Sequence, residues 1–138
     1  MSETNNISPG LTATQLIKKA IVQRIAKQGK DDFQLPTQTP EEIEAAYELA
    51  VEKDLHWDIV NEMRDSGIKT NLPAPYSRNY ETEIHAHFID GQWVAFVYYF
   101  GGGKYGNAEE IEWMEDAFFV DCKEEEKLVT IRTFSEKA

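Results

Sequence analysis

Three successive segments of the chain carry apolar residues at the spacing of an amphipathic helix. The first two segments begin with a Thr that is followed three residues later by Gln or Glu, which is the capping-box pattern of a helix start. Gly29 and Gly67 are expected to end the first and third helices. The pattern leaves open whether the second and third helices are separate or form one bent rod. We predict helices near residues 12–28, 40–53 and 55–66.

The hydrophobic period changes after residue 79 from helical to alternating, which is typical of β-strands. Asp90-Gly91 is a preferred dipeptide for a two-residue type I′ turn. This turn sets a register in which His85 faces Phe96 across the two strands. We therefore predict a β-hairpin made of residues 80–89 and 92–100.

The rest of the chain is expected to complete a single domain over residues 11–138, after a flexible tail at residues 1–10. The predicted fold class is α+β, with N-terminal helices packed on a mainly antiparallel four-stranded sheet formed by the C-terminal half. The other expected elements are an extended connector at 68–79, a glycine-rich loop at 101–106, a short helix at about 107–116, and two strands at about 117–122 and 128–134.

Charge is distributed unevenly along the 138 residues, which have a formal net charge of −11. Residues 1–30 carry five Lys or Arg against one Glu, a formal +4. Residues 31–138 carry 24 Asp or Glu against nine Lys or Arg, a formal −15. Most of the surface should therefore repel free nucleic acid and anionic membranes and attract a basic protein partner.

Signals for export or membrane insertion are not recognisable in the sequence. The N-terminal residues are polar and have no apolar core of a secretory signal. No stretch approaches the roughly 20 apolar residues that span a bilayer. The single cysteine, Cys122, excludes an intramolecular disulfide and fits a reducing compartment. We expect a cytoplasmic protein.

A dense group of carboxylates follows the glycine-rich loop. Such a group can be a solvated surface that keeps the protein soluble, or a surface complementary to a basic partner. In the second interpretation the aromatic residues around the glycines supply an adaptable anchor. The predicted partner-binding residues are Glu109, Glu110, Glu112, Glu115, Asp116, Tyr99, Lys104 and Tyr105.

A second candidate site lies on the predicted hairpin. Alternate strand residues share a face, so two imidazoles and a carboxylate would project together beside aromatic side chains of the next strand. This face could serve a small enzyme or a ligand-binding domain. Further metal ligands are not spaced nearby in the sequence, so no metal or cofactor is expected. The residues of this alternative face are Glu83, His85, His87, Phe96 and Tyr98.

Motifs for catalysis or nucleotide binding are missing or misplaced. The glycines at 101–106 match a dinucleotide fingerprint in letters, but they follow an antiparallel hairpin instead of the first strand of a βαβ unit. No nucleophile motif and no catalytic residues are recognised. The sequence therefore favours a small acidic binding or inhibitor protein that docks a basic surface of a protein partner, for example one that handles nucleic acid. It leaves the oligomeric state open.

Overall fold

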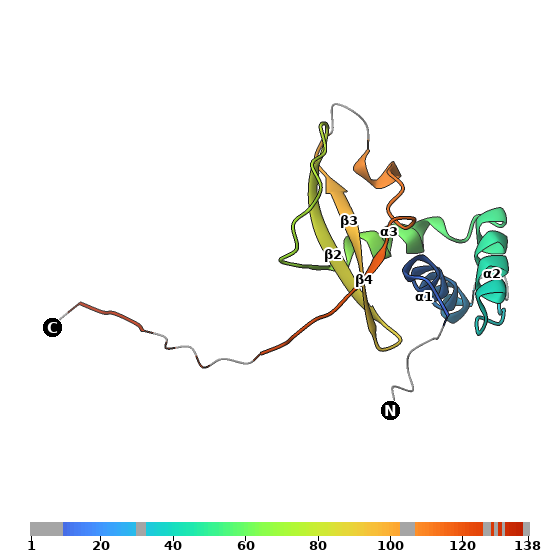
Figure 1. Ribbon diagram of the computed structural model, residues 1–138, viewed down its shortest axis with the longest axis horizontal. Helices are drawn as coiled ribbons and strands as arrows, with labels where there is room; N and C mark the ends of the chain where they lie inside the picture. The colour runs from blue at the N-terminus through green and yellow to red at the C-terminus, as the bar shows by residue number, and fades with distance from the viewer. Residues whose placement is uncertain are drawn as a thin grey trace.

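The structure, a computed structural model, describes residues 10–29, 33–102, 107–125, 128, 130 and 132–136. Within these residues, three α-helices of the N-terminal half pack on one face of a four-stranded antiparallel sheet, which confirms the predicted fold class (Figure 1). The strand order is β1-β2-β3-β4. The predicted tail lies, except for Gly10, outside the described residues. The elements are α1 (Ala13–Gln28), α2 (Pro40–Glu52), α3 (Trp57–Asp65), β1 (Ile68–Lys69), β2 (Glu81–Ile89), β3 (Gln92–Phe100), the 3-10 turn η3 (Ala108–Glu110) and β4 (Phe118–Val120).

Side-chain caps begin the first two helices as predicted. The Thr12 hydroxyl accepts a hydrogen bond from the Gln15 backbone N–H at 3.1 Å, and the Gln15 side chain accepts one from the Thr12 N–H. Thr39 and Glu42 form the same reciprocal pair at the start of α2. Gly29 ends α1 with a φ of 71°, which a residue without a Cβ adopts with little strain.

Helices α2 and α3 are separate, which decides the point that the sequence left open. Asp54 lies between them with a φ of 57°, and a right-handed helix cannot continue through this conformation. The Leu55 N–H instead donates to the Ala50 carbonyl at 2.9 Å. The break lets both helices contact α1.

The hairpin has the predicted turn and register. Asp90 and Gly91 have φ angles of 49° and 80°, the positive values that a type I′ turn requires. Antiparallel pairing extends along all of β2 and β3 and places His85 opposite Phe96. The turn dipeptide and the alternation of side chains were therefore sufficient to predict this part of the sheet.

The two edge strands differ from the prediction. β4 is shorter than the expected strand at 117–122. A strand at 128–134 is wrong for the residues of that segment that the structure describes. The place of the fourth strand is taken by β1, at the start of the segment predicted as a connector. Thr70 strengthens this short pairing, because its backbone N–H and its hydroxyl both donate to the Ile84 carbonyl at 2.8 Å.

Gly67 has a different role from the predicted helix stop. Ser66 is the C-cap of α3, and Gly67 is not among the residues with a positive φ. A Cβ at Gly67 would lie 3.1 Å from the Cβ of His85 and 3.1 Å from the ring of Phe96. The missing side chain therefore allows the chain to pass close to the sheet between α3 and β1.

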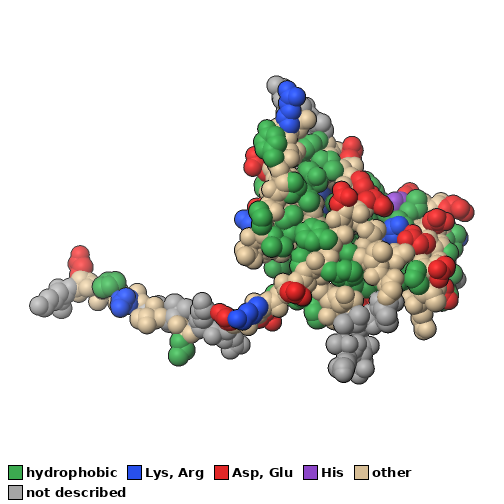
Figure 2. All heavy atoms as spheres, in the orientation of Figure 1, with side chains coloured by type: hydrophobic (Ala, Val, Ile, Leu, Met, Phe, Trp, Pro, Cys, Tyr) green, Lys and Arg blue, Asp and Glu red, His purple; other side chains and the backbone are tan. Residues whose placement is uncertain are grey.

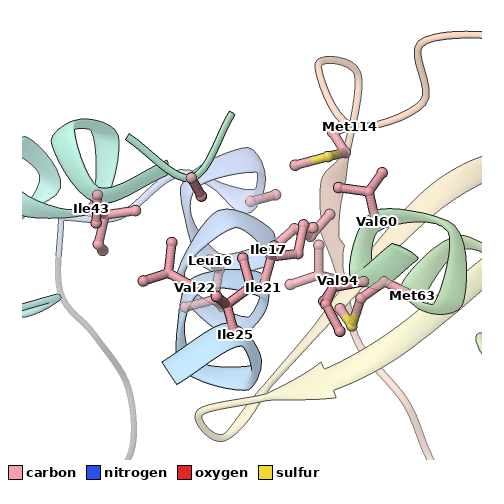
Figure 3. Close-up of a cluster of buried hydrophobic side chains, with 14 of the residues drawn as sticks. Leu16, Ile17, Ile21, Val22, Ile25, Ile43, Val60, Met63, Val94 and Met114 are labelled. Atoms are coloured by element: carbon pink, nitrogen blue, oxygen red, sulfur yellow. The ribbon is translucent and has the colours of Figure 1, made fainter. Parts of the chain in front are cut away.

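The main hydrophobic core lies between the helices and the sheet face that they cover, which we call the inner face. α1 is at its centre, between α2 and β3 (Figure 3). The opposite face of the sheet, which we call the outer face, has a smaller buried cluster, and no helix of the described residues covers it. Fully buried residues of the main core include Leu16, Ile17, Ile21, Ile25, Ile43, Met63, Val94 and Phe96.

Candidate functional site

The acidic segment at 107–116 is not the short helix that the sequence predicted. It contains the 3-10 turn η3, followed by bends. The Glu112 carboxylate accepts hydrogen bonds from the backbone N–H groups of Met114 and Glu115. Such local bonding between a side chain and the backbone competes with helical hydrogen bonds. The spacing of the acidic residues is typical of a helix, but the Glu112 side chain binds backbone N–H groups that a helix would use for its own hydrogen bonds.

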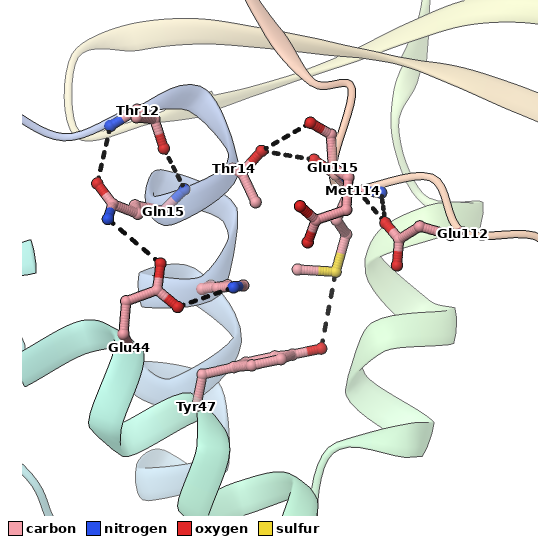
Figure 4. A network of polar contacts seen from close by, with 9 residues as sticks. Thr12, Thr14, Gln15, Glu44, Tyr47, Glu112, Met114 and Glu115 are labelled. Carbon is pink, nitrogen blue, oxygen red and sulfur yellow. Dashed lines mark hydrogen bonds and ion pairs between the residues drawn. The ribbon is translucent and has the colours of Figure 1, made fainter. Parts of the chain in front are cut away.

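Two neighbouring buried side chains hold this segment on the domain. Trp113 is 5% exposed and packs on Phe96, with 4.6 Å between the ring centroids. Met114 points towards α2, where the Tyr47 hydroxyl lies 3.8 Å from its sulfur, and its carbonyl accepts a hydrogen bond of 2.7 Å from the Thr14 hydroxyl of α1 (Figure 4). The sequence analysis indicated Met114 as an inward residue but did not single out Trp113.

All five predicted carboxylates of this segment are exposed. Burial, and then the negative charges of Glu112 and Glu115, raise the pKa of Tyr47 on α2 to about 12. In Figure 2, Asp and Glu side chains gather around η3 and also over α2. We call the following five residues the acidic face: Glu109, Glu110, Glu112, Glu115 and Asp116.

The cations of α1 do not form a separate basic surface, because most of them are paired across the fold. The ion pairs are Lys18–Glu44 at 2.9 Å, Lys19–Asp90 at 2.5 Å and Arg24–Glu62 at 2.7 Å. The hydrogen bond from Lys18 lowers the pKa of Glu44. Within the described part of the chain, no ion pair includes a residue of the acidic face. Carboxylates of neighbouring elements thus neutralise three cations of α1, whereas the carboxylates of the acidic face are not neutralised in this way.

The aromatic loop predicted beside the acidic face is only partly described. Lys104 and Tyr105 lie outside the described residues. Tyr99 projects from the outer face of β3, where its ring meets Tyr80 edge to face at 6.3 Å between centroids. Trp113 covers the inner face. The structure therefore places Tyr99 on the side of the sheet opposite the anchor of the acidic face.

The alternative ligand face forms the inner face of the hairpin and packs against the helices. Phe96 is fully buried in the main core. His87 stacks on Phe96 at 5.9 Å, and its Nε2 donates a hydrogen bond of 2.6 Å to the Met63 carbonyl of α3. Burial lowers the pKa of His87 below its ordinary value of 6.5. These contacts give Phe96 and His87 structural roles between the sheet and α3.

A polar cluster at the edge of the same face contains a buried charge that the sequence did not single out. Arg64 is 5% exposed and lies over the Tyr98 ring, 4.6 Å from its centroid. Its guanidinium donates to the carboxylate of Asp65 at 2.7 Å and also to the Tyr99 carbonyl. Burying an arginine without such partners would be strongly unfavourable. The cluster therefore joins α3 to β3.

His85 completes this cluster from β2. Its ring stacks on Tyr98 at 4.2 Å, and its Nε2 lies 2.9 Å from the Glu83 carboxylate. Hydrogen bonds from His85 and then Lys69 lower the pKa of Glu83. The buried Nδ1 of His85 has no hydrogen-bond partner among the described residues. In the same part of the chain, no three His, Cys, Asp or Glu side chains are grouped so that they could hold a metal ion.

The chain was compared with protein-family models, with curated proteins and with solved structures. No protein-family model matches the chain, and searches of curated proteins and of solved structures gave no match. Among the described residues, no helix has the length and apolar character needed to cross a membrane.

Proposed function

We propose that this protein is a small acidic binding or inhibitor protein that docks a basic surface of a partner protein through its acidic face. The observation that carries the proposal is the contrast in pairing. The five carboxylates of the acidic face are exposed and outside the ion pairs of the described residues, whereas three cations of α1 are already paired. Negative charge is thus available to a partner at this surface.

The manner in which the segment is held also supports a binding role. Trp113 and Met114 are buried directly beside exposed carboxylates. A held segment loses less conformational freedom on association than a free one, so a larger part of the interaction energy appears as affinity. Exposed carboxylates would mainly accelerate the encounter with a basic partner. Their effect should weaken with salt, because the Debye length is about 8 Å at physiological ionic strength.

The test begins with recovery of a partner on the immobilised full-length protein from a lysate of the source cells, with elution by salt. Surface-plasmon kinetics then compare the wild type with Glu109→Lys/Asp116→Lys. Glu112 is left intact, because its carboxylate accepts backbone hydrogen bonds within the segment. We expect the on-rate to fall about tenfold or more in the variant.

The matched control is Glu52→Lys/Glu81→Lys, which changes the net charge by the same amount at two exposed positions outside the acidic face. If both variants slow association equally, net charge acts without a specific surface and the acidic face is not the docking site. If neither variant changes the kinetics, the partner binds elsewhere. Circular dichroism of each variant verifies that the fold is retained.

The compartment and the class of partner belong to the same proposal. A cytoplasmic location fits the single cysteine, Cys122, which is exposed and free. The net charge of −11 disfavours direct binding to nucleic acid or to an anionic membrane. Fluorescence microscopy of the tagged full-length protein in the source cell would check the location.

A further inference from the structure

The outer face of the sheet is apolar and only partly covered. A segment that precedes β2 places Ala74 against a small buried cluster on this face. Other large apolar side chains there remain open to solvent. Phe88 is 61% exposed, Ile68 is 60% exposed and Phe118 is 39% exposed. Figure 2 shows hydrophobic side chains gathered over the strands. An apolar patch of this kind is a feature of interaction surfaces.

Two grooves mark this face, with volumes of about 590 Å³ and about 580 Å³. One includes Phe88 and the other includes Ile68. The grooves share Trp93, Val120 and the chain that directly follows β4. β4 is also an edge of the sheet, so one side of its backbone has no neighbouring strand among the residues that the structure describes. The C-terminal residues therefore leave the domain at the border of both grooves.

The described part of the chain after β4 carries two large apolar side chains that are open to solvent. We call residues 121–136 the C-terminal arm, of which the structure describes 121–125, 128, 130 and 132–136. The described residues extend away from the body of the protein (Figure 1). Leu128 is fully exposed and Phe134 is 86% exposed. In the sequence these two residues bound the run LVTIRTF, which has the β-branched and aromatic composition of a strand.

The connection between β4 and this run disfavours a return of the arm onto its own domain. The sequence from Cys122 to Lys127 has no Gly, Asn, Asp or Pro, although tight hairpins usually need such residues to reverse the chain. It contains three consecutive glutamates, whose mutual repulsion favours an extended chain. Asp90-Gly91 shows how this protein makes a tight hairpin elsewhere. An extended connection of this kind holds the described residues of the arm away from their own domain (Figure 1).

We propose that two copies of this chain exchange their C-terminal arms, each arm occupying the apolar grooves on the outer face of the other copy. Leu128 and Phe134 are the anchors of each arm in these grooves. Their separation of six residues spans about 20 Å in an extended chain, which suits a strand laid across two adjacent grooves. Reciprocal exchange closes the assembly as a two-fold dimer. The acidic face lies on the inner side of the sheet, so this inference is independent of the proposed function.

The experiment measures the mass of the full-length chain by analytical ultracentrifugation over a range of concentrations. We expect a monomer–dimer equilibrium for the wild type. The arm variant Leu128→Ser/Phe134→Ser should raise the dimer dissociation constant by about 100-fold or more, because the free energy from burying the two apolar side chains is lost. The groove variant Ile68→Ser/Phe88→Ser should have a similar effect. Leu35→Ser/Val51→Ser, at two exposed apolar positions outside the arm and the grooves, is the matched control and should leave the equilibrium unchanged.

Mixing the two double variants distinguishes arm exchange from other dimers. The arm variant has intact grooves and the groove variant has an intact arm, so the mixture should form a heterodimer that neither variant forms alone. A wild type that stays monomeric would overturn the proposal, and hydrogen exchange would then show whether the arm folds onto its own domain. A dimer that survives the arm substitutions would equally overturn it. Circular dichroism verifies that the groove variant remains folded.

Discussion

Replacement of Trp113 by Ala should destabilise the domain and release the acidic segment at the same time. The side chain is 5% exposed and packs on Phe96, which is itself fully buried. A buried Trp removes about 150–250 Å² from water, worth about 4–6 kcal/mol at about 25 cal/mol per Å². Ala retains a small part of this contribution. We therefore expect Trp113→Ala to lower the free energy of unfolding by about 3–5 kcal/mol.

Urea unfolding followed by circular dichroism measures this change, and Trp57→Ala is the matched control. Trp57 is 46% exposed on α3, so its loss should lower the free energy of unfolding by about 1 kcal/mol. In native buffer, the amides of Met114 and Glu115, which donate to the Glu112 carboxylate, should exchange faster in Trp113→Ala. Equal losses of stability for the two Trp variants would refute the assignment of Trp113 as the anchor of the acidic segment.

Three further substitutions test separate parts of the fold. His87→Gln should reduce the loss of thermal stability between about pH 7.5 and about pH 5.5. Burial lowers the pKa of His87, so below about pH 6.5 the unfolded chain takes up a proton on this residue more readily than the folded protein does. The contribution of His87 to the free energy of unfolding is therefore lost as the pH falls. An unchanged pH profile in a calorimetric series would contradict this. Gly67→Ala should lower the free energy of unfolding by about 1 kcal/mol or more, because its Cβ would crowd the Phe96 ring at 3.1 Å, and equal urea midpoints would argue against that crowding. Thr39→Ala should destabilise the domain by about 1 kcal/mol through loss of the α2 cap, whereas Thr39→Ser should preserve most of the stability in the same measurement.

Features that depend on neighbours in the chain were predictable from the sequence. The capping pairs that begin α1 and α2 need only residues three positions apart, and the structure contains both. The turn at Asp90-Gly91 requires positive φ angles that this dipeptide readily adopts, and it set the register of the whole hairpin. Local backbone preference and side-chain periodicity were sufficient for these elements.

Features that depend on distant contacts were decided only by the tertiary structure. Glu112 and Trp113 turned an expected helix into a bent segment, because one bonds to backbone donors and the other finds Phe96 across the fold. β1 has two residues, too few for a periodic signal, and exists because β2 supplies its hydrogen-bond partners. Gly67 appears in the sequence as a helix stop, yet its small size is required by its close approach to β2 and β3, which follow later in the chain. Sequence patterns record local propensity, whereas packing between separated segments determines which residues are covered and which surface remains available to a partner.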